Sequence, residues 1–265
     1  MHTEVLSFIA VAPGAEPGLA ASALTGDSLV IKNNQGPIRP TVLAAWGFQQ
    51  ANGYQQVAFP SGHDTTRGYR YAVAASNTSA RLPEGAFMAM TAQEQLSITV
   101  VGSATALDQE LGCLLVHYPQ LPGVQSRAIT YNEYLNRLEK LTTIQATVGG
   151  VTGGIYQEEL INEDSDLLMA NRDYAIIGME AAVPCLAVTL RGTDLGNVRV
   201  ACPGGNNVDG YQSNFFASLA QTFGMPLIPV INSGNRNNTF LGVVQNEAGA
   251  AAGAVPITIY LALLA

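Results

Sequence analysis

Charged side chains are scarce in this chain of 265 residues. Asp, Glu, Lys and Arg make up 12% of it, about half the share in an ordinary soluble domain. A monomer with so few charges has a poorly solvated surface, which indicates that neighbouring subunits cover part of it. Basic residues are the rarer kind, 12 against 20 acidic residues, and they form no run. The net charge of −8 argues against a protein that binds nucleic acid through a basic surface.

Cysteine and targeting signals are also scarce. Cys113, Cys185 and Cys202 form no CxxC pair, so neither a disulfide framework nor a zinc site is indicated, and we expect three buried free thiols. The first residues lack the basic region of a signal peptide. Residues 248–265 carry no charge, but two glycines and Pro256 interrupt them. We expect a turn and a last buried strand there rather than a membrane span.

What the chain does contain is an internal repeat. Matching residues recur in the same order, at an offset of 137 residues in the first part and of 142 or 143 residues in the second. They are Val11 with Val148, Asp27 with Asp164, Asn34 with Asn171, Ala44 with Ala181, Pro60 with Pro203, Val100 with Val243, and Tyr118 with Tyr260. One insertion of five or six residues between positions 183 and 198 accounts for the change of offset. The common order indicates two copies of one fold.

Both copies have the pattern of β-strands: short runs, partly β-branched or aromatic, separated by Gly, Pro, Asn and Ser. The predicted strands are 4–11, 19–24, 28–32, 41–49, 55–59, 69–75, 86–90, 96–101 and 113–118, then 142–148, 155–161, 166–170, 175–181, 185–191, 197–202, 227–231, 240–244 and 256–263. About eight strands per copy is typical of a jelly roll. We therefore predict an all-β fold of two tandem eight-stranded jelly-roll sandwiches with a short linking helix, over residues 1–120, 121–142 (the linker) and 143–265.

Two stretches have helical periodicity. In residues 131–141 the apolar side chains fall on one face. These side chains are Tyr131, Tyr134, Leu135, Leu138 and Leu141. The pattern predicts a linker helix that packs across the junction between the copies. Residues 215–223 predict a second, short helix inside a connection between strands.

Few residues are candidates for catalysis. The three histidines are His2, His63 and His117. His117 matches Ile259 in the second copy, which favours a packing role. Ser61-Gly62-His63-Asp64 has the residue types of a catalytic triad, but a triad needs a preorganised base between partners that are usually distant in sequence. The matching stretch 204–207 has none of these reactive groups, so we predict a turn and no catalytic residue. The only tryptophan, Trp46, is expected in the core.

Acidic residues gather before position 167, and some of them have the spacing of a calcium loop. Asn162, Asp164 and Asp166 fit the first three ligand positions, and Asp173 falls at the twelfth. However, Leu167 stands where the loop needs glycine, and the last ligand should be a glutamate flanked by helices. Solvated turn acids, including the nearby Glu158, Glu159 and Glu163, are the favoured interpretation, and a structural calcium near Asp164 and Asp166 stays open. The glycine-rich stretch 149–154 lacks the lysine of a phosphate-binding loop and predicts a hairpin turn.

Two tandem sandwiches with a helical linker resemble the double jelly-roll major capsid proteins of tailless icosahedral, membrane-containing viruses. The paired segments on which this resemblance rests are 27–34 with 164–171, 60–69 with 203–211, and 96–118 with 240–260. The resemblance covers nearly the whole chain and is architectural, without a diagnostic motif. It implies a structural protein rather than an enzyme, with no cofactor or metal. It also implies a homotrimer that forms a pseudo-hexameric block of the virion shell and is made in the host cytoplasm. The implied partners are lattice neighbours, minor capsid proteins and an internal membrane, with no sequence-specific contact to nucleic acid.

Other interpretations stay open at this stage. A carbohydrate-binding surface β-sandwich protein has the same fold class, although such sites usually expose aromatic platforms and this chain has one tryptophan. A virion spike or fibre component is barely separable from a shell subunit by sequence. A hydrolase built on two jelly rolls would need a convergent set of acids and bases that the sequence does not supply.

Overall fold

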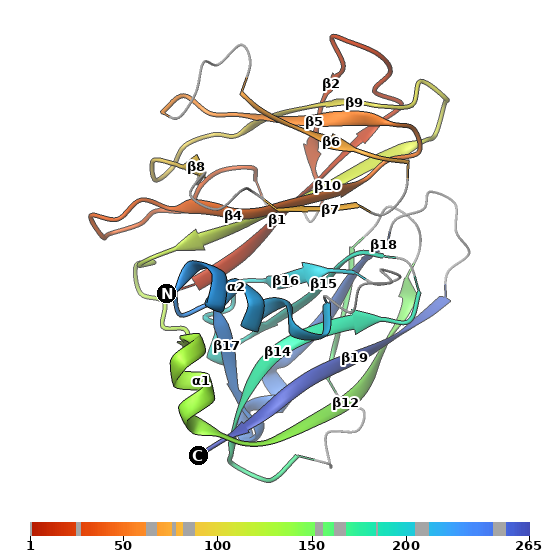
Figure 1. The fold of residues 1–265 in the computed structure, drawn as a ribbon. Helices are drawn as coiled ribbons and strands as arrows, with labels where there is room; N and C mark the ends of the chain where they lie inside the picture. Colours follow the sequence, from red (N-terminus) through yellow and green to blue (C-terminus); the bar gives the residue numbers. More distant parts are fainter. Residues whose placement is uncertain are drawn as a thin grey trace.

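The computed structural model describes residues 2–24, 28–61, 68–75, 78–81, 88–151, 156–161, 168–183, 185–204, 212–245 and 253–265. These residues form four antiparallel β-sheets with few helices (Figure 1). The predicted all-β class is therefore confirmed. None of the helices in these ranges is long and apolar enough to cross a membrane.

Residues before position 119 form two of the sheets. The N-inner sheet has the order β3-β1-β10-β4-β7, with β8 also on β4, and the N-outer sheet has the order β2-β9-β5-β6. Their strands are β1 (His2–Val11), β2 (Leu19–Ala20), β3 (Ser22–Ala23), β4 (Thr41–Phe48), β5 (Gly53–Ala58), β6 (Tyr69–Val73), β7 (Thr78–Arg81), β8 (Met88–Ala89), β9 (Ser97–Val101) and β10 (Gln109–Tyr118). Leu6, Phe8, Val57, Ile98 and Leu114 help to fill the core between these two sheets.

Residues after position 127 form the other two sheets. The C-inner sheet has the order β13-β18-β15-β16, and the C-outer sheet has the order β11-β17-β14-β19-β12. Their strands are β11 (Ala128–Ile129), β12 (Leu138–Val151), β13 (Tyr156–Leu160), β14 (Asp173–Ala181), β15 (Cys185–Gly192), β16 (Val200–Pro203), β17 (Ile228–Asn232), β18 (Thr239–Gln245) and β19 (Gly253–Leu264). Val188, Leu190, Val243, Ile257 and Ile259 are among the buried residues between them.

The same strand order occurs twice. Within the first eight-strand set, β1 pairs with β10, β2 with β9, β4 with β7, and β5 with β6. The second set repeats this nesting, because β12 pairs with β19, β13 with β18, β14 with β17, and β15 with β16. The N-inner sheet therefore corresponds to the C-outer sheet, and the N-outer sheet corresponds to the C-inner sheet.

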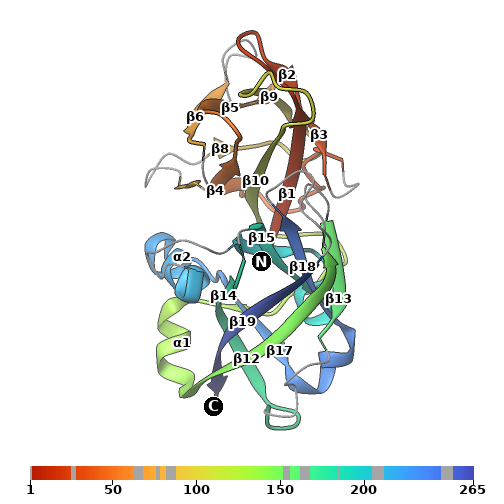
Figure 2. The ribbon, with the colours of Figure 1, turned by 90° about the vertical axis from the view of Figure 1, so that its right-hand side faces the viewer.

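The two inner sheets pack against each other in the middle of the molecule. The four sheets lie as layers in the order N-outer, N-inner, C-inner and C-outer (Figures 1 and 2). β10 is buried on both faces: Leu114 and Val116 point into the N-terminal core, whereas Leu111, Cys113 and Leu115 join the core shared with the C-terminal sheets. This double burial explains the continuous apolar run at the end of the first copy.

Trp46 on β4 fastens this junction. Its side chain is 1% exposed, and its indole Nε1–H donates to the Leu186 carbonyl on β15 at 2.8 Å. Its ring meets Phe215 edge to face, with the ring centroids 6.2 Å apart. At the other side of the junction, the Val5 N–H of β1 donates to the Arg199 carbonyl at 2.8 Å. The prediction that Trp46 lies in the core is confirmed.

The two predicted helices form, but one is shorter than predicted. α1 spans Tyr131–Arg137, and a capping box between Thr130 and Glu133 satisfies its first N–H groups. The chain turns extended at Leu138 and pairs with β19, so the expected helix end at 141 is wrong. Cross-strand pairing outweighs the helical periodicity of residues 138–141. α2 (Phe215–Phe223) has its predicted bounds and ends at Gly224, whose φ is +64°.

In the described residues, short 3₁₀ helices connect strands of the C-terminal sheets. They are η2 (Thr193–Leu195), η3 (Gln212–Asn214) and η4 (Ser233–Asn238). η3 lies directly on β14: a Cβ added to Gly178 would come within 1.9 Å of the Gln212 carbonyl oxygen. The glycine therefore allows the entry to α2 to lie close to the C-outer sheet.

Several predicted strands and residue matches differ from the structure. Residues 28–32 form only an isolated bridge at Val30, and the described part of 166–170 is not a strand. Tyr118 is fully buried in the N-terminal core, whereas Tyr260 lines an open groove. The two tyrosines therefore lie on opposite faces of corresponding strands, and the predicted match between them is wrong, since a slip of an odd number of residues moves a strand side chain to the other face. Pro60 follows β5, whereas Pro203 lies in β16, the counterpart of β6, so that match is wrong too.

We expect Trp46→Ala to destabilise the protein by about 3–5 kcal/mol, the usual range for truncating a buried large aromatic side chain. The change leaves a cavity at the junction and removes the donor to the Leu186 carbonyl. Urea unfolding followed by far-ultraviolet circular dichroism measures the loss. Leu107→Ala is the control, because Leu107 is 80% exposed and its truncation should change stability by less than about 0.5 kcal/mol. Equal effects of the two variants would contradict the role given to Trp46.

Candidate functional site

A cluster of Tyr, Glu and Arg lies on the exposed face of the N-outer sheet. The Tyr54 hydroxyl donates to Glu16 Oε1 at 2.6 Å, and Arg70 Nη1 donates to the same oxygen at 2.9 Å. The Arg70 guanidinium lies 4.5 Å from the centre of the Tyr54 ring. The hydrogen bonds from Tyr54 and Arg70 hold the pKa of Glu16 below its usual value. The cluster is therefore an ion pair with an aromatic base, open to solvent.

A hollow of about 600 Å³ adjoins this exposed cluster. Side chains of the neighbouring strands β5, β6 and β9 line it. On these strands Gln56 lies opposite both Arg70 and Thr99. The other lining residues are Pro17, Ala58 and Ser97. The surface combines a few charged groups with hydroxyl and amide groups, which suits an extended polar contact.

A second cluster of the same residue types lies on the C-inner sheet. The Tyr156 hydroxyl donates to Glu158 Oε2 at 2.7 Å, and Arg199 Nε lies 3.7 Å from the same carboxylate. The Arg199 guanidinium is 4.9 Å from the centre of the Tyr156 ring. Burial raises the pKa of Tyr156 to about 12. Burial also opposes ionisation of Glu158, but hydrogen bonds from Arg191 and Tyr156 outweigh it and lower its pKa.

The second cluster borders the junction, whereas the first is open. The Arg199 carbonyl accepts the hydrogen bond from Val5 of the N-inner sheet. The side chains of Arg199 and Glu158 are 20% and 22% exposed, against 49% and 60% for Arg70 and Glu16. The two arginines come from corresponding parts of the sheets, since Arg70 lies on β6 and Arg199 directly precedes β16. Corresponding sheets therefore carry similar clusters, and only one of the two is covered.

A groove runs along the outer face of the C-outer sheet. It encloses about 500 Å³ between α1, η3 and strands β12, β14 and β19. None of its lining residues is charged; they are Tyr134, Leu141, Thr142, Thr143, Ile177, Ser213, Asn214, Tyr260 and Leu261. Leu141 is 59% exposed, and Leu135 on α1 is 50% exposed. Part of the apolar stripe predicted for residues 131–141 thus faces solvent.

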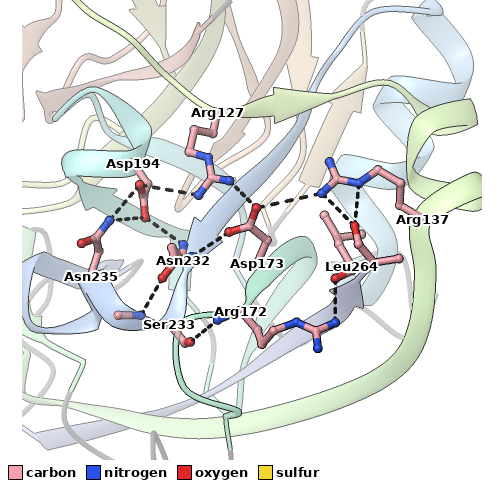
Figure 3. A network of polar contacts seen from close by, with 11 residues as sticks. Arg127, Arg137, Arg172, Asp173, Asp194, Asn232, Ser233, Asn235 and Leu264 are labelled. Atoms are coloured by element: carbon pink, nitrogen blue, oxygen red, sulfur yellow. Dashed lines mark hydrogen bonds and ion pairs between the residues drawn. The ribbon is translucent and has the colours of Figure 1, made fainter.

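A polar network ties the linker to the C-terminal sheets (Figure 3). Arg127 binds Asp173 at the start of β14, and Asn232 Nδ2 donates to the same carboxylate at 2.8 Å. Asp194 accepts from the Asn232 backbone N–H at 2.8 Å, and Arg137 of α1 donates to the Ala265 carbonyl at 3.2 Å. Each charged group is engaged by protein partners. We interpret this network as a lock for the linker rather than a site of chemistry.

The residues considered for catalysis are not brought together. His2 and His117 are buried beside the junction, at 4% and 3% exposure, which agrees with the packing role expected for His117. His63 and Asp64 lie outside the described residues. Among the residues that the structure describes, no three His, Cys, Asp or Glu side chains are placed to hold a metal ion.

The residues of the possible calcium loop are also separated or undescribed. Asn162, Glu163, Asp164 and Asp166 lie outside the described residues. Asp173 belongs to the linker network, and Glu158 belongs to the covered Tyr-Glu-Arg cluster. Glu159 lies on β13, with its carboxylate 3.3 Å from the position of a Cβ added to Gly149.

The three cysteines are free and buried, as predicted. Burial raises the pKa of Cys113 and Cys202 well above the usual value of a thiol. Sequence reasoning missed both Tyr-Glu-Arg clusters, because Glu16 and Arg70 are 54 residues apart. No local sequence motif predicts such a cluster. Its members come together only through the pairing register of the strands.

Comparisons with known proteins find similarity among solved structures. No protein-family model matches the chain, and no curated protein does. The structure is similar to one titled "Crystal structure of PBSX exported protein XepA", with a TM-score of 0.28 and 9% sequence identity, over 97% of this chain and 86% of that chain. A TM-score this low supports no inference about function.

We expect Arg127→Ala to destabilise the protein by about 1–3 kcal/mol, since it leaves a partly buried carboxylate without its main donor. Burial opposes ionisation of Asp173, while Arg127 and Asn232 together hold its pKa below the usual value. The pKa of Asp173 should therefore rise in the variant, as measured by carboxyl carbon resonances in an NMR titration. In Arg70→Ala, a control at the exposed ion pair with Glu16, the loss should be smaller, because water and salt screen that pair. An unchanged pKa of Asp173 in Arg127→Ala would refute the lock.

Stability should fall as the pH is lowered from about 6.5 to about 4. Burial lowers the pKa of both His2 and His117 to about 4, whereas the unfolded chain binds these protons near pH 6.5. The unfolded state therefore gains protons first over this range, and the two histidines contribute no further change below it. The loss is on the order of 3 kcal/mol for each group.

Urea unfolding at pH 7, 5.5 and 4.5 measures this dependence. The double variant His2→Gln/His117→Gln should show a flatter decline over the same range. A decline equal to that of the wild-type chain would show that other groups cause it.

Proposed function

We propose that the chain is the structural subunit of a virion shell, a double jelly-roll capsid protein that assembles as a homotrimer. The observation that carries the proposal is the nested strand order, which occurs twice in one chain with the two inner sheets packed face to face. No catalytic group, cofactor or metal takes part in this function.

The nested pairing supports a jelly roll in each half. In a jelly roll, eight strands form two sheets in which the first strand pairs with the eighth, the second with the seventh, the third with the sixth, and the fourth with the fifth. Both eight-strand sets follow this order. The additional strands β3, β8 and β11 are two residues long each and extend the sheets without changing it.

The surface supports an assembled rather than a solitary protein. The chain carries few charges, and eight large hydrophobic side chains are at least 44% exposed among the residues that the structure describes. They are Val11, Leu19, Ile38, Leu107, Leu135, Leu141, Leu160 and Met169. Single exposed apolar residues are normal on a monomer, but Leu141 lines an uncharged groove. Neighbouring subunits of a shell would cover such surfaces.

In this function the partners are other copies of the chain, minor capsid proteins and an internal membrane. The shell encloses the genome without binding it directly, in keeping with the net charge of −8. The chain is made in the cytoplasm of the host and ends up in the virion.

Sedimentation equilibrium of the purified protein tests this proposal. We expect a mass near three times 27.8 kDa, and electron microscopy of concentrated samples should show ordered sheets or closed shells. A trimer that never forms a lattice would point to a spike or fibre component. A stable monomer that binds glycans on an array would overturn the proposal in favour of the carbohydrate-binding alternative.

A further inference from the structure

Within each chain, one contact joins the N-terminal pair of sheets to the C-terminal pair. Sheets that correspond to the two members of this contact also lie at the two ends of the stack. The N-inner sheet packs against the C-inner sheet. By strand order, the C-outer sheet corresponds to the N-inner sheet, and the N-outer sheet corresponds to the C-inner sheet. The two outer sheets lie at opposite ends of the stack (Figures 1 and 2). Each chain thus presents the two members of this contact on separate faces.

We propose that the N-outer sheet of one copy packs against the C-outer sheet of the next copy, repeating between chains the contact that joins the sheet pairs within one chain. The partner is a second copy of this chain. The inference rests on the proposed function and adds the two faces that meet.

The paired Tyr-Glu-Arg clusters are the first argument. On the C-inner sheet, Arg199 stacks on Tyr156, binds Glu158, and contacts Val5 of the N-inner sheet through its carbonyl. On the corresponding N-outer sheet, Arg70 and Tyr54 form a similar cluster with Glu16, in which Arg70 and Glu16 are 49% and 60% exposed. The covered cluster borders a contact between two sheets. The exposed cluster of Glu16, Tyr54 and Arg70 is therefore suited to border a second contact of this kind.

The exposed cluster contributes little to the stability of a single chain. Ion pairs between side chains as exposed as Arg70 and Glu16, at 49% and 60%, are screened by water and salt. Tyrosine and arginine are among the residue types that dominate the energy of protein interfaces. The cluster therefore fits an interface better than it fits a role within the monomer.

The C-outer sheet is the complementary face. Residues 141–151 of β12 and all of β19 contain no charged side chain. The helix α2 packs against β14 and β17, so the open part of this face is the groove along β12 and β19. By strand order, these two strands correspond to β1 and β10, which make the contact within the chain. Leu141 stands in the groove as an apolar anchor for the incoming sheet, and Tyr260 lies beside it with its hydroxyl donating to Glu180 Oε2 at 2.9 Å.

The contact is heterologous, because two different faces meet. Each copy keeps one free face of each kind after one contact, so the arrangement either closes into a ring or continues without end. A ring of three copies contains three contacts within chains and three between chains. Each sheet pair in such a ring has the same kind of neighbour on both sides.

Charge placed on either face should abolish assembly. We expect Arg70→Glu, which blocks the N-outer face, and Leu141→Asp, which blocks the C-outer face, each to weaken self-association about tenfold or more, as measured by sedimentation equilibrium. Ser97→Glu is a second variant for the N-outer face, since Ser97 lines the hollow without joining the cluster. The controls introduce the same acidic residues elsewhere: Arg39→Glu, and Met169→Asp at a residue that is 56% exposed.

Mixing the two blocked variants gives the sharper test. In an equimolar mixture, the intact N-outer face of the Leu141→Asp chain can bind the intact C-outer face of the Arg70→Glu chain. The outer ends of that pair are blocked, so assembly stops at a 1:1 complex of twice 27.8 kDa. Neither variant alone forms it. A contact between two identical faces would not give this result, because one variant of the pair would then assemble by itself.

The outcomes separate this inference from the proposed function. If the wild-type chain and the controls assemble while the face variants do not, and the mixture gives the 1:1 complex, the inference holds. If the wild-type chain assembles and the face variants assemble equally well, the faces are wrong while the shell function stands. If the wild-type chain remains a monomer at every concentration, the proposed function fails and the inference falls with it.

Discussion

The packing of the two inner sheets against each other is the contact on which the rest of the structure depends. A β-sandwich normally has one buried and one solvated face per sheet, but here β10 and β15 are buried on both. Cys113, Leu115 and Trp46 meet residues of the C-terminal sheets where polar side chains would otherwise face water. Separating the sheet pairs would expose this apolar surface, so the two halves stabilise each other as well as themselves.

Most of the architecture could be predicted from the sequence, because it follows from the alternation and length of apolar runs. Strand candidates such as 41–49 and 185–191 lie within a residue of β4 and β15, and Trp46 and the three cysteines are buried as expected. The end of α1 could not be predicted, since Leu138 follows its periodicity but is drawn into pairing with β19. Local propensity loses there to a long-range partner.

The register of residues along the strands could not be predicted from the sequence either. Tyr118 and Tyr260 lie on corresponding strands, yet one is buried and the other lines a groove. An offset between two copies that is wrong by one residue still finds the right strands but reverses their faces. For the same reason the Tyr-Glu-Arg clusters could not be predicted, because Glu16, Tyr54 and Arg70 meet only once the register of β5 and β6 is known. The chain order of elements survives such errors, whereas surface chemistry does not.

The buried thiols can be used to detect separation of the two halves of the molecule. Cys113 and Cys185 belong to facing sheets, and burial raises the pKa of the Cys113 thiol well above its usual value. A thiol-specific reagent can react there only after the two halves have parted or the chain has unfolded. The rate of labelling therefore reports how often the stack opens, in a free subunit or in a shell, without any added probe.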